Sequence, residues 1–289
     1  MAGQKGDTMQ DGAWLDRMYN NRELVPDHAR YFERWAAESR AARERQACEI
    51  DVRYGDGPNE TLDVFPADRP GAPVLVFIHG GYWRGMDKSE HSFVAPAFTQ
   101  AGACVVVPNY ELCPKTTIPG IALQMVQALA WTWRNIAQYG GDPGRITVTG
   151  HSAGGHLAAL MMACDWPAVD VLLPGNLARS AISISGLHDL EPMMRTPFLQ
   201  PSLRLTPQDV ARASPARLPA PRAGKVVAVA GGDESPEFHR QARLLREAWG
   251  GARVPVCEIL AGLNHFSVMD AFAQPGHRLH QLSLGLLNA

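Results

Sequence analysis

The stretch ITVTGHSAGGHLAALMMA at residues 146–163 decides the fold class of this chain. Its first four residues are all β-branched, as is common in a buried strand. A glycine-rich turn follows and leads into small and long apolar residues, which predict a helix over 154–164. The turn reads G-x-S-x-G, with Ser152 at its centre. Between a strand and a helix, this pentapeptide predicts a nucleophile elbow, in which a strained backbone exposes the serine hydroxyl.

The rest of the chain repeats the alternation of strand and helix. Short, nearly continuous apolar runs predict strands that are buried on both faces, at 74–78, 104–107, 146–149, 181–184, 226–230 and 254–259. Helices are predicted between and after them, at 88–100, 119–138, 154–164, 237–249 and 277–287. Such alternation is typical of βαβ units. Together with the elbow, it predicts an α/β-hydrolase fold with a mostly parallel central sheet and helices on both faces.

Three flanking segments complete the predicted single domain over 1–289. Residues 27–47 are rich in helix formers and predict a helix on the outside of the core, within an N-terminal helical extension over 1–48. Short strands near 49–54 and 62–65 are separated by a GDGPN turn, which predicts a hairpin. Residues 186–222 hold seven of the 22 prolines. We interpret them as an insertion that shapes the active-site pocket, the alternative being an irregular connector without a role.

Composition excludes several classes of function. Hydrophobic residues make up 46% of the chain and the formal net charge is -2, so the sequence has material for a core and no basic excess for nucleic acid or an anionic membrane. No apolar run approaches the roughly 20 residues of a membrane span. The first twelve residues lack an apolar run, so we expect no secretory signal. Five scattered cysteines without a C-x-x-C pair argue against disulfides and zinc, and favour the cytoplasm.

A serine becomes a nucleophile only when a base accepts its proton and a third group orients that base. In the α/β-hydrolase arrangement these follow the order serine, acid, histidine. His265 is the predicted base because it lies in the loop AGLNHF at 261–266, just after the last strand. His156 is expected to point along its helix, away from Ser152. The remaining helical histidines are predicted to be surface residues: His239, His277 and His280.

Two adjacent carboxylates compete for the role of the acid. The strand at 226–230 is followed by GGDES, which contains Asp233 and Glu234. Glu234 is preferred because it is the fourth residue counted from Gly231, and Asp233 is the alternative. The carboxylate that does not orient His265 is expected to serve the N-terminus of the following helix.

The motif HGGYW at 79–83 follows the strand at 74–78 directly and predicts an oxyanion hole. Glycines let backbone N–H groups approach the substrate closely. One wall of the hole is therefore assigned to Gly80, Gly81 or Tyr82, and the other to Ala153, the residue after the nucleophile.

The aromatic residues of the same motif are predicted to bind substrate. Tyr82 and Trp83 are expected to line the pocket, where an aromatic leaving group could stack on them. Core packing is the alternative for Trp83. His79 is interpreted as a residue that orients this loop and not as a second base.

Several motifs together resemble the kynurenine formamidase (arylformamidase) branch of the α/β hydrolases. They occur in order along most of the chain: YNNRELVPDH at 19–28, HGGYW at 79–83, NYELCP at 109–114, GHSAGGHL at 150–157, SGLHDLEP at 185–192, DESPEFHRQ at 233–241 and NHF at 264–266. The resemblance implies hydrolysis of the formamide of N-formylkynurenine by a serine, an acid and a histidine, without metal or organic cofactor. The chain departs from the family at Glu234, where an aspartate is more common.

These observations predict a serine hydrolase that cleaves an aryl formamide or a small-acyl ester through an acyl-enzyme. A carboxylesterase of broad specificity is the alternative enzyme. A non-catalytic binding protein with the same fold is disfavoured, because such proteins usually lose a member of the triad. The expected partner is a small-molecule substrate, with no nucleic acid and no membrane, and a homodimer is left open.

Overall fold

The computed structural model describes residues 11–289. The expectation that the chain begins without a secretory signal concerns mainly residues 1–10, which lie outside this range, as does the start of the extension at 1–48. Within the described range, no helix combines the length and the apolar character needed to cross a bilayer.

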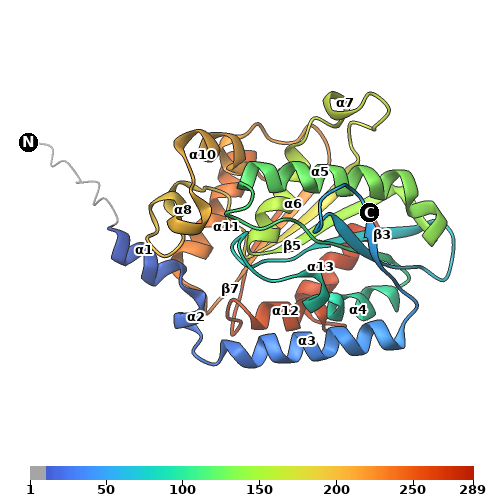
Figure 1. The fold of residues 1–289 in the computed structure, drawn as a ribbon, viewed down its shortest axis with the longest axis horizontal. Coiled ribbons are helices and arrows are strands. Elements are labelled where there is room, and N and C mark those ends of the chain that lie inside the picture. Colours follow the sequence, from blue (N-terminus) through green and yellow to red (C-terminus); the bar gives the residue numbers. More distant parts are fainter. Residues whose placement is uncertain (1–10) are drawn as a thin grey trace, which may run out of the picture.

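One eight-stranded sheet forms the centre of the molecule (Figure 1). Its spatial order is β1-β2-β4-β3-β5-β6-β7-β8. The antiparallel pairs β1–β2 and β2–β4 lie on one side, and the strands from β4 through β8 run parallel. The strands are β1 (Glu49–Arg53), β2 (Thr61–Phe65), β3 (Ala72–Ile78), β4 (Cys104–Pro108), β5 (Gly141–His151), β6 (Ala178–Ile184), β7 (Lys225–Gly231) and β8 (Val256–Leu260). The mostly parallel sheet and the β1–β2 hairpin are thus confirmed.

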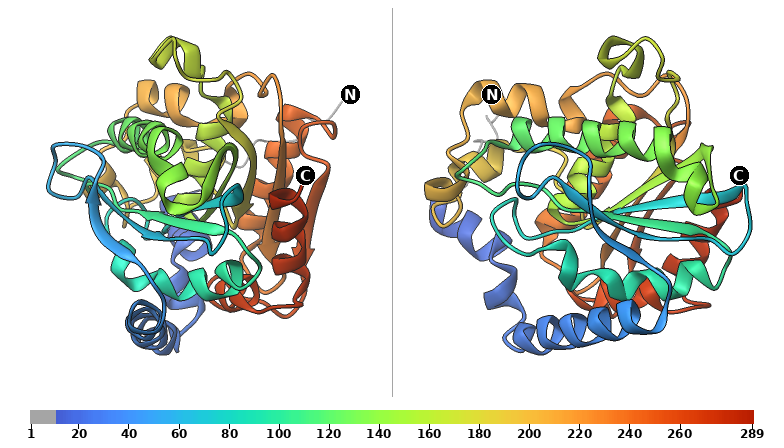
Figure 2. Two further views of the ribbon diagram at one scale, coloured as in Figure 1. Left: turned by 90° about the vertical axis from the view of Figure 1, so that its right-hand side faces the viewer. Right: turned by 45° about the vertical axis from the view of Figure 1, so that its right-hand side comes forward.

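Helices cover both faces of the sheet (Figure 2). One apolar core lies under α1 (Gly12–Tyr19), α5 (Ile118–Asn135), α6 (Ala153–Ala163), α7 (Trp166–Val169), α8 (Glu191–Arg195), α9 (Gln200–Leu203), α10 (Pro207–Ala213) and α11 (Pro236–Trp249). The other lies under α3 (His28–Arg45), α4 (Ala95–Thr99), α12 (Ser267–Ala273) and α13 (Arg278–Leu287). The short α2 (Asn21–Leu24) joins α1 to α3. Short 3₁₀ turns are η1 (Lys88–Glu90), η2 (Ser92–Val94), η3 (Ile136–Tyr139) and η4 (Pro215–Arg217).

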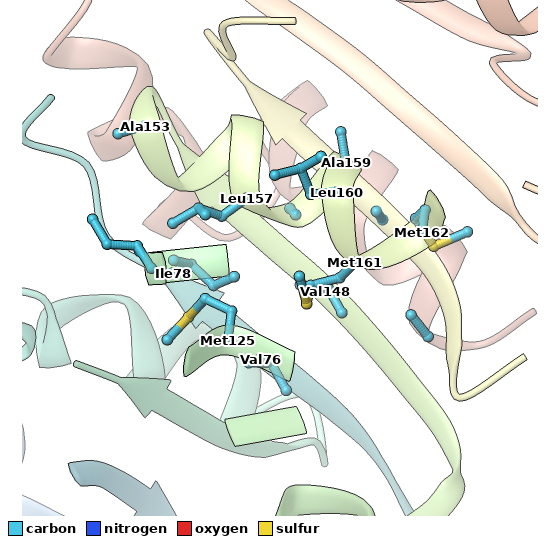
Figure 3. Packing of buried hydrophobic residues seen from close by; sticks show 14 of the residues in the cluster. Val76, Ile78, Met125, Val148, Ala153, Leu157, Ala159, Leu160, Met161 and Met162 are labelled. Carbon is cyan, nitrogen blue, oxygen red and sulfur yellow. The ribbon is translucent and has the colours of Figure 1, made fainter. Parts of the chain in front are cut away.

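The helix that follows the elbow is buried on all sides. Every residue of α6 from Ala153 to Met162 is buried, as expected for a helix without a polar face. Figure 3 shows Leu157 and Met161 of α6 near Val148 of β5 and Met125 of α5. Burial of each large apolar side chain contributes about 1.5–3 kcal/mol. This packing fixes the position of α6, and with it the position of the serine at its N-terminus.

One prediction about local structure is wrong, and two other segments contain helices that were not individually predicted. The helix expected over 88–100 is replaced by η1, η2 and α4, because Pro96 lacks an N–H and cannot lie inside a continuous helix. The segment at 186–222 contains α8, α9, α10 and η4. Helix α1 was not predicted, although Asp11 caps its N-terminus and the apolar residues Leu15 and Tyr19 recur at helical spacing.

Candidate active site

Four loops that contain the predicted site residues begin at the same edge of the sheet, because the carboxyl ends of the parallel strands all lie there. Ile78 at the end of β3 pairs with Gly150, and His151 at the end of β5 pairs with Ile184 of β6. Gly231 at the end of β7 pairs with Leu260 of β8. The register of the sheet therefore brings the HGGYW loop, the elbow, the carboxylate loop and the histidine loop together.

Ser152 lies in a strained turn between β5 and α6. Its backbone has φ 55° and ψ -116°, a conformation that non-glycine residues rarely adopt. The N–H of Ser152 donates to the carbonyl of Ile184 at 2.8 Å, and the N–H of His156 donates to the carbonyl of Ser152 at 3.1 Å. Backbone contacts on both sides of the turn thus hold the strained residue in place.

The glycines around Ser152 are required by close approaches of the backbone. A Cβ atom on Gly154 would overlap the carbonyl oxygen of Ile78, and one on Gly150 would overlap the backbone of Gly154. These overlaps involve main-chain atoms, which cannot move aside as a side chain would. The requirement for tiny residues at the elbow is therefore imposed by β3 and by the first turn of α6.

His265 and Glu234 form a buried pair. Nδ1 of His265 lies 2.8 Å from Oε2 of Glu234, and the two residues are 5% and 8% exposed. The other carboxylate oxygen, Oε1, accepts from the hydroxyl of Ser185 at 2.5 Å and from the N–H of Gly231 at 2.6 Å. Three donors therefore fix the carboxylate, and the bond to Nδ1 orients the imidazole so that Nε2 is free for the nucleophile.

The structure brings Glu234, and not Asp233, to His265. Asp233 is exposed, and its N–H donates to the carbonyl of Leu263 at 3.0 Å. The expectation that the second carboxylate caps α11 is not met, because the N-cap residue of that helix is Ser235 and no side chain caps it. Asp233 instead helps to join the carboxylate loop to the histidine loop through its backbone.

His151 and Ser185 are two residues at the site that the sequence analysis did not single out. Nε2 of His151 lies 2.8 Å from the carbonyl oxygen of His265, and the two rings are 4.7 Å apart. Burial, followed by the charge of His265, lowers the pKa of His151, so its ring is neutral and Nε2–H donates. Ser185 has φ 51° and holds Glu234. Ser185 is the first residue of the SGLHDLEP motif, and this motif was the sequence signal that could have indicated its role.

The HGGYW loop passes next to Ser152. A Cβ atom on Gly80 would lie 3.3 Å from the Cβ of Ser152, so the backbone there is close to the serine side chain. Gly81 has φ 103°, and Tyr82 has φ 49°. His79 supports the loop from behind, because its ring stacks on Tyr110 at 4.2 Å and the Tyr110 hydroxyl donates to the carbonyl of His79 at 2.9 Å.

The candidate oxyanion donors have no acceptor within the protein. Across residues 11–289, the N–H groups of Gly81, Tyr82 and Ala153 make no hydrogen bond to a backbone or side-chain oxygen. Ala153 is the first residue of α6, where helix geometry leaves N–H groups unpaired and favours negative charge. Free donors next to Ser152 are what a developing oxyanion requires.

The two predicted aromatic residues have different positions. Tyr82 lines the cavity, and its hydroxyl donates to the carbonyl of Tyr19 at 2.6 Å. Trp83 is fully buried and meets the ring of His156 edge-on at 5.0 Å, and it is not part of the cavity wall. The prediction that Trp83 lines the pocket is therefore wrong, and the alternative of core packing describes it. The motif alone does not reveal which way each ring points from the turn.

The other histidines lie away from the reacting groups. Nε2 of His156 lies 2.6 Å from the carbonyl oxygen of Ala213 in α10, so this side chain reaches a neighbouring helix and does not point along its own as expected. His239 and His277 are partly exposed, whereas His280 is 3% exposed and packs against Phe98. The prediction of a surface position for His280 is wrong, because α13 turns that side chain into the core. No group of three or more metal-binding side chains occurs in the described part of the chain.

A cavity of about 480 Å³ opens beside Ser152 and His265. Residues from several distant parts of the chain form its wall. They are Asn20, Asn21, Arg22, Phe32, Trp35, Gly81, Tyr82, Arg84, Gly85, Met86, His151, Ser152, Phe198, Ser202, His265 and Phe266. The N-terminal helices and the segment at 186–222 thus complete a pocket whose floor is the catalytic edge of the sheet.

Comparisons with known proteins agree with this geometry. The BD-FAE family model matches residues 62–169. The chain is 32% identical to kynurenine formamidase of Danio rerio over 247 residues, which cover 82% of this chain and 81% of the relative. It is 38% identical to esterase LipQ of Mycobacterium tuberculosis over 167 residues, covering 52% and 39% of the two chains. A crystal structure from Silicibacter sp. TM1040, provisionally described as a thioesterase, superposes with a TM-score of 0.83 and 32% identity, covering 95% and 99% of the two chains.

Proposed function

Since the chain belongs to the kynurenine formamidase family of α/β hydrolases, we propose that it hydrolyses the formamide bond of an aryl formamide such as N-formylkynurenine. The chain is a hydrolase of the serine type. The observation that carries the proposal is the buried Glu234–His265 pair beside the cavity that also contains Ser152. The roles of Ser152 as nucleophile, His265 as base and Glu234 as the acid are part of this proposal.

In the first step Nε2 of His265 accepts the proton of the Ser152 hydroxyl as Oγ attacks the formyl carbon. Glu234 stabilises the resulting imidazolium through the 2.8 Å contact at Nδ1. The tetrahedral intermediate collapses when His265 returns the proton to the leaving aryl amine. This leaves a formyl ester on Ser152, and a water activated by His265 then releases formate.

The oxyanion of each tetrahedral intermediate is held by backbone N–H groups of Gly81, Tyr82 and Ala153. Their lack of acceptors in the protein supports this role, as does the approach of Gly80 to Ser152. Preorganised donors of this kind contribute about 2.7–4 kcal/mol each to the stabilisation of a transition state. The dipole of α6 adds to the stabilisation because Ala153 is its first residue.

A carboxylesterase acting on short acyl esters is the second candidate function. The similarity to LipQ, named an esterase, favours it. The same nucleophile, base and oxyanion donors would serve an ester, so the acyl group and the leaving group distinguish the two functions.

A substrate panel on the purified protein tests the choice. For a formamidase we expect kcat/KM on N-formylkynurenine to exceed that on 4-nitrophenyl acetate, and activity to fall further on 4-nitrophenyl butyrate. A preference for the butyrate ester over the formyl substrate would exclude the formamidase. Labelling of Ser152 by a fluorophosphonate, located by mass spectrometry, would report on the nucleophile independently of the substrate.

The same proposal includes a cytoplasmic location and a small-molecule substrate, with no role for nucleic acid. All five cysteines are free, which suits a reducing compartment. The formal net charge of -2 offers no general attraction for a polyanion. A homodimer remains a prediction, and sedimentation of the purified chain would test it.

A further inference from the structure

The junction of α1 and α2 is attached to the catalytic loops. The Tyr82 hydroxyl donates to the carbonyl of Tyr19 at 2.6 Å, and the Ser235 hydroxyl donates to the carbonyl of Met18 at 2.6 Å. The Tyr19 hydroxyl donates to Glu237 at 2.6 Å from a fully buried position. These contacts come from both sides of the site, the oxyanion loop and the carboxylate loop. They hold the next residues of the chain, 20–22, in the cavity wall.

Two guanidinium groups contribute to the cavity wall. Arg84 is half-buried, and its Nη1 donates to the carbonyl of Phe198 at 2.7 Å and to the Ser202 hydroxyl at 3.2 Å. Its Cζ also lies 5.3 Å from the centre of the Phe198 ring. Arg22 is exposed, and its Cζ lies 5.5 Å from the centre of the Phe32 ring. An aromatic ring thus contacts each group, and neutral acceptors hold Arg84 as well.

No carboxylate balances these charges. The residues that line the cavity include no aspartate or glutamate, and neither arginine forms a salt bridge within residues 11–289. Elsewhere in this range arginines commonly have such partners, for example Arg240 with Glu237 and Arg195 with Glu191. Arg22 and Arg84 line the same cavity, and burial, followed by repulsion from the positive charge of Arg22, lowers the pKa of Arg84. An anion in the cavity would relieve that repulsion.

We propose that Arg22 and Arg84 form the subsite for a carboxylate on the leaving group of the substrate, and that these two residues set a preference for charged over neutral substrates. This inference rests on the proposed function in one respect, because a small acyl group has no room for the carboxylate and the leaving group must carry it. Planar guanidinium groups suit a carboxylate, to which they can donate in pairs. Five aromatic rings in the wall suit an aryl body between the carboxylate and Ser152: Phe32, Trp35, Tyr82, Phe198 and Phe266.

The test compares substrates that differ only in charge. One pair is N-formylkynurenine and its carboxamide, and a second pair is 3-acetoxybenzoate and 3-acetoxybenzamide. For the wild type we expect kcat/KM to be at least about tenfold higher for the charged member of each pair. In Arg22→Gln the preference should fall about fivefold, because Arg22 is exposed and partly screened. Arg84→Gln should lower it about tenfold or more, while Arg22→Lys retains most of it.

Controls separate the subsite from general effects on folding. Arg17 lies on α1, is exposed and does not line the cavity, so Arg17→Gln should leave the preference unchanged. Fluorophosphonate labelling of each variant reports the fraction of correctly formed sites, which matters for Arg84 because it also holds Phe198. Activity on both the charged and the neutral substrates should remain within about twofold of the wild type in Arg17→Gln.

The outcomes distinguish this inference from the proposed function. Absence of formamide hydrolysis, with the charge preference retained on the acetoxy pair, would overturn the formamidase and support the subsite. Equal rates on charged and neutral members of both pairs would overturn the subsite, whatever the enzyme's preference between formamides and esters. A loss in Arg22→Gln that is equal for charged and neutral substrates would overturn it as well.

Discussion

The catalytic edge of the sheet and the wall of the cavity are built in different ways. Ser152, Gly80 and Glu234 lie within a few residues of the strand ends that position them, and backbone groups of neighbouring loops hold Ser152 and Glu234. The wall combines α2 and α3 with the segment at 186–222, which is far from them in the chain (Figure 1). We infer that the chemistry depends on short local motifs, whereas selectivity depends on long-range packing. Variants at the edge should therefore affect every substrate, and variants in the wall only some.

Removal of the nucleophile should produce the largest effect. We expect Ser152→Ala to lower kcat by at least about 10⁴-fold on formamides and esters alike, because both reactions pass through the acyl-serine. Progress curves with N-formylkynurenine and 4-nitrophenyl acetate measure the loss. Circular dichroism should show an unchanged fold. Retention of the wild-type rate on either substrate would contradict the catalytic role of Ser152.

The two adjacent carboxylates offer a matched pair. Glu234→Gln should lower kcat by about 10³–10⁴-fold, since an amide cannot stabilise the imidazolium and can hold the wrong tautomer of His265. Asp233→Asn should stay within about twofold, because the Asp233 side chain is exposed and its backbone contact survives. Steady-state kinetics on one substrate decides between them. Similar losses in the two variants would refute the assignment of Glu234.

A methyl group at the elbow should affect stability strongly. Gly154→Ala places a Cβ against the carbonyl of Ile78, so we expect a loss of about 3–5 kcal/mol in the free energy of unfolding. Gly285→Ala in α13 is the control, because open space surrounds that position and alanine should stabilise the helix by about 0.5–1 kcal/mol. Urea denaturation monitors both. A Gly154→Ala protein as stable as the wild type would show that the backbone there can move.

Buried neutral histidines should make the framework around the catalytic edge sensitive to acid. Burial lowers the pKa of His156 from 6.5 to about 4. Between these values the unfolded chain binds a proton at this position and the folded chain does not, so stability present above pH 6.5 is lost as the pH falls. The loss is about 1.4 kcal/mol for each pH unit below 6.5, until the folded pKa is reached.

Replacement of this histidine tests the linkage directly. The free energy of unfolding of the wild type should fall between pH 7.5 and 5.5 by about 1.4 kcal/mol more than that of His156→Gln. Each protein serves as its own reference at pH 7.5, which removes the general cost of losing the contact to Ala213. An identical acid loss in the two proteins would mean that His156 titrates normally in the folded state.

The smallest effect is expected at Tyr82, whose hydroxyl links the cavity wall to the HGGYW loop. Tyr82→Phe removes the hydroxyl that donates to the carbonyl of Tyr19 but keeps the ring in the cavity. We expect KM for N-formylkynurenine to rise about two- to threefold with kcat nearly constant, which corresponds to loss of one hydrogen bond of about 0.5 kcal/mol. The KM for 4-nitrophenyl acetate should change less. A larger change in kcat than in KM would show that the Tyr82 hydroxyl, and not only its backbone N–H, acts in the chemical step.

Much of the fold and of the site follows from local pattern. The apolar runs predicted the parallel strands, because a strand buried on both faces needs apolar residues at every position. The elbow, the HGG motif and the loop of His265 carried their own signals, since each depends on a few residues in sequence. The predicted positions of Trp83 and His280 are wrong because they do not depend on local pattern. The environment of each side chain is decided by helices that pack on it from elsewhere in the chain.

The sequence alone was enough to assign the family and to predict the nucleophile and its base, because strained turns and close backbone approaches permit very few residue types at each position. It left two carboxylates open, and only the register of β7 and β8 decided that Glu234 faces His265. The tertiary structure alone also placed Arg22 and Arg84 in one cavity, 62 positions apart in sequence. The charge of a pocket depends on which side chains from distant parts of the chain line it, and a local sequence pattern does not predict which ones do.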